Sequence, residues 1–157
     1  MNMANYNFSK RRLHKIEAAL LGGIIVFTAT DGHTAGRRDV DRPASGEFGS
    51  GPRMSVGGQY AATLRLEEPL RPRKMRSIRV LIGDAAGSAV DGALITIDGG
   101  MPQHGHGLPT NPRVTGNPGG GIYEIGGVRF NMGGWWEFKL TINGPSGIDT
   151  VTFNLDL

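Results

Sequence analysis

The sequence contains no cysteine. This absence excludes a disulfide framework, a thiolate metal site and a cysteine nucleophile. It leaves the compartment open, because exported proteins without disulfides are common.

A surplus of one charge is also missing from most of the chain. The formal net charge is +3, from 17 basic and 14 acidic residues. Much of the surplus lies in Lys10, Arg11, Arg12 and Lys15, and beyond Gly32 the two signs nearly balance. The body therefore lacks the basic face that nucleic-acid binding requires, and we expect no nucleic-acid partner.

Glycine, by contrast, is abundant, with 26 glycines and 9 prolines among 157 residues. Glycine costs about 1 kcal/mol at each helix-interior position, which argues against a helical bundle. The apolar share of 38% and the charged share of 20% argue against a wholly disordered chain. The composition favours short strands joined by glycine-rich turns.

A basic stretch followed by an apolar one occupies residues 9–30. Its uncharged part, Ala18–Ala29, has the length of a signal-peptide core and is shorter than the ~20 residues that cross a bilayer. We predict that residues 1–32 are a signal peptide or a retained signal anchor, and that the rest is periplasmic or otherwise extracytoplasmic. If retained, residues 13–30 anchor the chain to the inner membrane and are its only membrane contact. The alternative is an amphipathic helix of the domain.

Residues 33–58 lack periodicity and are rich in glycine, serine, proline and charge. This composition predicts a flexible linker, so that the folded domain occupies residues 59–157.

Alternating apolar residues recur through residues 60–157, with turn signals every eight to twelve residues. This pattern predicts an all-β fold, an immunoglobulin-like antiparallel β-sandwich of about seven strands. A small barrel is the alternative, and Gly116–Gly121 is expected to form a hairpin turn. The residues expected to face inward are Leu64, Leu66, Ile78, Val80, Ile82, Ile97, Trp136, Phe138, Leu140, Val151 and Phe153.

Two further groups of side chains have more than one interpretation. Trp135 and Trp136 are adjacent in a strand and point to opposite faces. Either one of them is exposed for docking, or both are buried, one of them under a loop. The basic residues between Arg71 and Arg79 are expected to be solvated edge and turn residues, since charge at a sheet edge blocks aggregation.

The segment Asp98–Arg113 carries the only pattern that suggests site chemistry. Met101, His104 and His106 lie close together in it, and Met132 follows later at the end of a short strand. Imidazole and thioether donors suit copper, particularly Cu(I), better than a hard cation. We therefore predict a copper site formed by Met101, His104, His106 and Met132. The alternative is a structural loop without metal, in which the histidines bond backbone carbonyls and Met101 packs into the core.

The same region carries a family resemblance. Its motifs are Asp84-x-x-Gly87-x-x-Val90-x-Gly92-Ala93, Met101-Pro102-x-His104-Gly105-His106-Gly107, Gly121-x-Tyr123 and Phe130-x-Met132-x-Gly134-x-Trp136. In their order and spacing they resemble the YtkA-like and FixH-related families. The resemblance implies an exported or membrane-anchored immunoglobulin-like domain, and some relatives are linked to copper delivery or oxidase assembly. At Gly133, where such proteins often have proline, this chain departs from the pattern.

The sequence shows no catalytic arrangement. It has no defensible Ser-His-Asp set, no phosphate-binding loop after a strand and no zincin helix. We expect no enzyme, but an accessory protein that handles copper and has a protein partner in a redox or membrane complex. The alternative is a structural or interaction module of an exported or membrane assembly.

Overall fold

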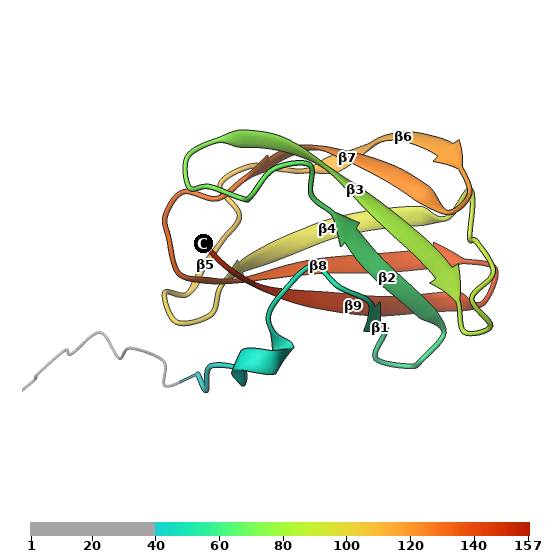
Figure 1. Ribbon diagram of the computed structural model, residues 1–157, viewed down its shortest axis with the longest axis horizontal. Helices are drawn as coiled ribbons and strands as arrows, with labels where there is room; N and C mark the ends of the chain where they lie inside the picture. Colours follow the sequence, from blue (N-terminus) through green and yellow to red (C-terminus); the bar gives the residue numbers. More distant parts are fainter. Residues whose placement is uncertain (1–39) are drawn as a thin grey trace, which may run out of the picture. The chain divides into compact units, whose positions relative to one another are not determined.

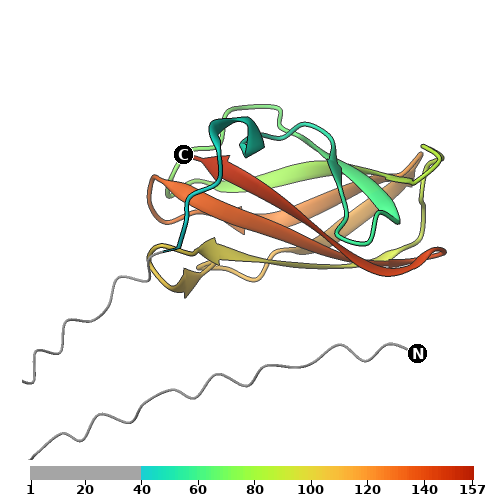
Figure 2. The same ribbon diagram turned by 90° about the horizontal axis from the view of Figure 1, so that it is seen from below.

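Two antiparallel β-sheets pack face to face in the computed structural model, which describes residues 40–157 (Figure 1, Figure 2). The predicted all-β, immunoglobulin-like sandwich is confirmed, and a closed barrel is excluded because the strands form two separate sheets. The larger sheet has the order β1 (Arg53–Met54), β2 (Tyr60–Arg65), β3 (Met75–Asp84), β7 (Ile122–Arg129), β6 (Arg113–Gly119). The smaller sheet has the order β5 (His106–Gly107), β4 (Leu94–Met101), β8 (Trp135–Gly144), β9 (Gly147–Asp156).

The core lies between the sheets and follows the two-residue period of the strands. In β8, for example, Trp136, Phe138 and Leu140 are fully buried, while Glu137 and Lys139 between them are partly exposed. The residues predicted to face inward are buried, except Leu66 and Ile97, which are half-buried and pack against the margin of the core. Alternation therefore identified the inner face of both sheets correctly.

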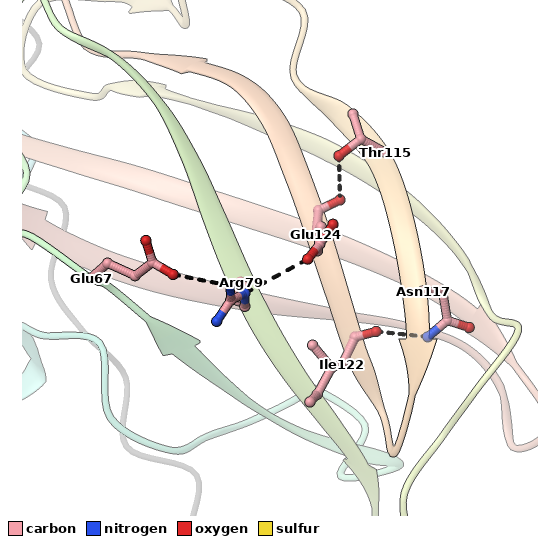
Figure 3. A network of polar contacts seen from close by, with 6 residues as sticks. All are labelled: Glu67, Arg79, Thr115, Asn117, Ile122 and Glu124. Carbon is pink, nitrogen blue, oxygen red and sulfur yellow. Dashed lines mark hydrogen bonds and ion pairs between the residues drawn. The ribbon is translucent and has the colours of Figure 1, made fainter.

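The β6 strand differs from the expectation for its segment. Gly116–Gly121 was expected to be a hairpin turn, but β6 runs to Gly119 and pairs with β7 through two irregularities of register. At these irregularities the side chain of Asn117 takes the place of a backbone donor, since its Nδ2 donates to the Ile122 carbonyl at 2.7 Å (Figure 3). An edge strand made largely of glycine, asparagine and proline has no apolar alternation, which explains why the pattern did not reveal it.

Residues 42–58 also differ from the expectation, because they contact the sandwich. A short 3₁₀ turn, η1 (Ser45–Glu47), leads to Phe48, which forms an isolated bridge to Asn154 of β9. The β1 strand then pairs with β2, so the packed part of the chain begins before residue 59, where the domain was expected to start. The expected signal segment, residues 1–32, and residues 33–39 lie outside the described residues. Among residues 40–157, no helix has the length and apolar character needed to cross a membrane.

The connections lie at two ends of the sandwich. The β2–β3 loop, the β4–β5 hairpin, the β7–β8 turn and the C-terminus share one end, on the left in Figure 1, which we call the β5 end. The opposite end carries the β1–β2, β3–β4, β6–β7 and β8–β9 connections.

At the opposite end, the carboxylate of Asp149 holds the β1–β2 turn against β9. It accepts hydrogen bonds from the backbone N–H groups of Gly57 at 3.0 Å, Gln59 at 3.2 Å and Thr150 at 2.8 Å. The Ser55 hydroxyl, followed by the amide donors, lowers the pKa of Asp149 to about 2. The side chain has an exposed fraction of only 8%, so its stability as an anion depends on these donors.

We expect the loss of this carboxylate charge to destabilise the domain. The folded pKa of about 2 lies below the ordinary value of 3.8, so the contribution is complete above pH ~4 and is lost as the pH falls toward 2. Asp149→Asn should lower stability at neutral pH and flatten the decline between pH ~4 and ~2, as measured by urea unfolding across this range. Asp98→Asn is the control, because that carboxylate bonds only the adjacent Gly99 amide. An unchanged acid profile in Asp149→Asn would contradict the assignment.

Candidate metal site at the β5 end of the sandwich

The histidine segment forms a tight hairpin at the end of β4. The Met101 carbonyl accepts hydrogen bonds from the His104 N–H at 3.0 Å and the Gly105 N–H at 2.9 Å. The chain then returns as β5, in which His106 pairs directly with Met101. Cross-strand partners project from the same face of a sheet, so the Met101 and His106 side chains are neighbours.

Both histidines of this hairpin are exposed. The His104 and His106 rings are stacked, with centroids 5.7 Å apart and planes inclined by 14°. The hydrogen bonds of the hairpin among residues 40–157 are made by backbone atoms, and neither imidazole bonds a carbonyl there. This arrangement differs from the structural alternative, in which the imidazoles would hold the loop by such bonds.

Trp136 is a buried residue that lies beside the histidine hairpin. Its ring centroid lies 5.9 Å from that of His106. The register of β4 and β8 pairs Gly100 with Glu137, and its continuation sets Met101 opposite Trp136 on the inner face. Met101 has an exposed fraction of 2%, so its thioether belongs to the apolar core beneath the histidines.

Met132 lies in the β7–β8 turn, at the same end of the sandwich. The indole Nε1 of Trp136 donates to the Met132 carbonyl at 3.1 Å, which holds the turn over the indole. The Met132 side chain is 38% exposed. The structure thus brings all four predicted donors to one end of the sandwich, two of them exposed imidazoles, one a buried thioether and one a partly exposed thioether.

The donor types restrict what this end can bind. Among residues 40–157, no three His, Asp, Glu or Cys side chains gather in a way that would hold a metal ion. An ion held by His104 and His106 would find no third ligand of these types there, and thioether sulfur is the remaining donor in the predicted set. Imidazole with thioether is a donor set for copper, above all Cu(I), and not for magnesium or calcium.

Trp136 is the residue that sequence reasoning missed as part of the site. The pattern placed it in the core, but its position beside His106 depends on the registers of β4 with β5 and β8, which have no local signal. Trp135 is also buried, on the outer face of the smaller sheet, where its Nε1 donates to Asn154 Oδ1 at 3.0 Å. The interpretation with both tryptophans buried is therefore the correct one.

A polar network on the outer face of the larger sheet pairs one arginine with two glutamates. Arg79 lies between Glu67, at 3.1 Å, and Glu124, at 3.7 Å, and the hydroxyl of Thr115 donates to the Glu124 carbonyl (Figure 3). These groups are exposed, and exposed pairs contribute about 0–1 kcal/mol each. Arg79, one of the basic residues between Arg71 and Arg79, therefore takes part in ion pairs on the sheet surface, as expected for a solvated residue.

Gly134 gives a test of the packing beneath the site. Its φ of +116° lies outside the region that alanine tolerates, and a Cβ would stand 3.0 Å from the Met101 Cε. Gly105 is a matched control, since its φ of +68° is left-handed and nothing lies within 4 Å of a Cβ. Gly105→Ala should cost about 1–2 kcal/mol in urea unfolding, and Gly134→Ala at least about 1 kcal/mol more. Equal losses would contradict the contact between Gly134 and Met101.

The family of the chain follows from comparison with known proteins. A family model described as YtkA-like matches residues 55–141, more than half of the chain. The matched segment runs from the β1–β2 turn into β8 and contains Trp136 and all four predicted donors. No curated protein and no solved structure shows a significant match. The protein belongs to the YtkA-like family.

Proposed function

We propose that the protein is an exported, non-catalytic accessory protein that binds copper through Met101, His104, His106 and Met132. The observation that carries the proposal is the pair of exposed, stacked imidazoles, which form no hydrogen bond within residues 40–157 and lie beside Trp136 at the end of the sandwich that also carries Met101 and Met132. Unbonded, exposed imidazoles can turn toward a shared ion at little cost. The proposal requires the imidazole nitrogens and thioether sulfurs to converge on one ion at about 2.0–2.3 Å.

The environment of the donors favours Cu(I). Thioether sulfur is a soft ligand, and the buried position of Met101 removes one side of the ion from water. A site with few exposed ligands on a hairpin also permits release, which suits a protein that passes copper on. We assign it to metal handling rather than to catalysis.

The wider setting follows from the resemblance and the leader. The finer likeness to the FixH-related proteins supports a role in oxidase assembly, with a protein partner in a redox or membrane complex. The basic and apolar segment of residues 9–30 supports a periplasmic domain, anchored to the inner membrane by residues 13–30 if that segment is retained.

A structural or interaction module is the second candidate. Met101 is part of the hydrophobic core, and Trp136 packs against Phe130 with ring centroids 5.2 Å apart, so both residues stabilise the fold without any metal. In that case the histidine hairpin is a surface loop of an accessory subunit.

Copper titration separates the two candidates. We expect the full chain to bind about one Cu(I) at this site in competition with a chromophoric Cu(I) chelator. His104→Ala or His106→Ala should abolish this binding, because two imidazoles are the only nitrogen donors that the site offers. Met101→Leu and Met132→Leu should weaken Cu(I) more than Cu(II), since the thioether prefers the softer ion. Met101→Leu conserves volume and should cost less than about 1.5 kcal/mol in stability.

Met54→Leu is the matched control, because Met54 is an exposed methionine in β1, away from the β5 end. Tryptophan emission gives a second measurement. In Trp135→Phe the remaining indole is Trp136, 5.9 Å from His106, and its emission should change on copper binding, whereas Trp136→Phe should respond less. Equal copper uptake by the wild type and the double-histidine variant would favour the structural module.

Export is tested independently of the metal. A reporter that is active only outside the cytoplasm, fused after Leu157, should be active, because the basic residues before Ala18 favour retention of the N-terminus inside. The mass of the purified protein then distinguishes a cleaved signal peptide from a retained anchor. An inactive reporter with full expression would contradict the proposed location.

A further inference from the structure

Charge is distributed unevenly along the sandwich. Residues 40–157 contain as many acidic as basic side chains, so this part of the chain is formally neutral. The connections at the opposite end include Asp84 and Asp91, and the segments 55–59, 84–93 and 143–147 contain no lysine or arginine. Within residues 40–157, charge is therefore separated into an acidic end and a basic end.

The basic end is the β5 end, where most of the basic side chains form no ion pair. Arg42, Arg76, Arg79 and Lys139 each form an ion pair with a carboxylate, and two of these pairs, Arg42 with Asp156 and Arg76 with Glu68, lie at the β5 end. Five further exposed basic residues, on the β2–β3 loop and at the ends of β6 and β7, form no ion pair within residues 40–157. We call them the basic rim: Arg71, Arg73, Lys74, Arg113 and Arg129.

The basic rim is physically joined to the candidate metal site. The Arg73 N–H donates to the Phe130 carbonyl at 2.6 Å, which fixes the β2–β3 loop to the β7–β8 turn. The Phe130 ring packs against Trp136, and Trp136 contacts His106. Arg73 itself has a φ of +65°, a conformation in which glycine would be less strained. The presence of arginine at a strained position suggests that its side chain is used.

We propose that the β5 end is a docking surface for an acidic face of the protein with which copper is exchanged, and that the basic rim orients this encounter. The inference rests on the proposed copper function and names the chemistry of the partner. A charged patch around a site raises association rates by about 10 to 10³-fold at low salt and much less at high salt. Because residues 40–157 carry no net charge, they do not attract anions in general. The separation of charge instead turns the basic rim, and the histidines at the same end, toward an acidic partner.

The exposed apolar residues at this end favour a protein partner over a lipid surface. They are Met75, 57% exposed and paired with Arg129, and Met132. Both offer thioethers to a soft ion, and within residues 40–157 no exposed large hydrophobic residue is aromatic. Surfaces that bind membranes typically insert tryptophan, phenylalanine or leucine beside their cations.

Copper-transfer kinetics test the proposal on the full chain. The probe is a synthetic Cu(I)-loaded peptide with methionine and histidine ligands and aspartate flanks, compared with a peptide of asparagine flanks. Transfer to the wild type should be about 10-fold faster from the aspartate peptide at about 10 mM salt, and the two rates should converge near 1 M, where the Debye length is about 3 Å. Equal rates from both peptides at low salt would overturn the proposal.

Charge-matched variants locate the effect. Arg71→Gln/Lys74→Gln should abolish most of the preference for the aspartate peptide, whereas Arg53→Gln/Lys139→Gln removes the same charge from strands outside the β5 end and should retain it. Arg73→Gly should reduce the preference while relieving the strained φ, so a loss of folding does not explain it. An equal loss in both double variants would show a net-charge effect and overturn the proposal.

Separate measurements test the copper function and the docking surface. The equilibrium Cu(I) affinity, measured by chelator competition, should be unchanged in the rim variants and tests only the metal site. Binding of the metal-free aspartate peptide, measured by fluorescence anisotropy, tests only the rim and should be lost in Arg71→Gln/Lys74→Gln. Vesicles containing phosphatidylglycerol are the third probe. Rim-dependent binding to these vesicles, without discrimination between the peptides, would overturn the proposal in favour of a lipid surface.

Discussion

The inward position of Trp136 at the start of β8 is the constraint on which the β5 end depends. The indole fills the space between the sheets where β4 ends, and it contacts Phe130 from the larger sheet. Its Nε1 needs a buried acceptor, which the Met132 carbonyl provides. His106 lies against the same ring, so the hairpin and the β7–β8 turn are positioned by one side chain.

The two ends of the sandwich are stabilised by different interactions. At the opposite end, Asp149 and Asp91 accept backbone N–H groups from glycine-rich turns, and these bonds lower the pKa of both carboxyls. At the β5 end, apolar packing around Trp136 holds the loops, so the polar side chains above it are not needed for the fold. Imidazoles and cations that form no hydrogen bond or ion pair within residues 40–157 are available for a ligand. The candidate metal site and the basic rim both lie at this end for that reason.

Much of the fold was predictable because strands with one buried face alternate. Phe138, Leu140, Val151 and Phe153 follow this period, and they are all buried as expected. The β6 strand was not predictable, since its exposed glycine and asparagine residues pack against nothing that selects apolar side chains. Residues 42–58 were missed for a similar reason: they attach through backbone groups, as in the Val56 N–H bond to Thr150, which leave no mark on composition.

The candidate site was predictable in its residue types but not in its geometry. The spacing of Met101, His104 and His106 within one glycine-rich segment is local, and the sequence by itself determined that these donors would lie close together. Only the tertiary structure decided that Met101 is buried, that Met132 lies at the same end, and that the Trp136 indole lies beside His106 and bonds the Met132 carbonyl. These relations depend on strand register across three separate segments, and register is selected by the packing of the whole core rather than by any local pattern.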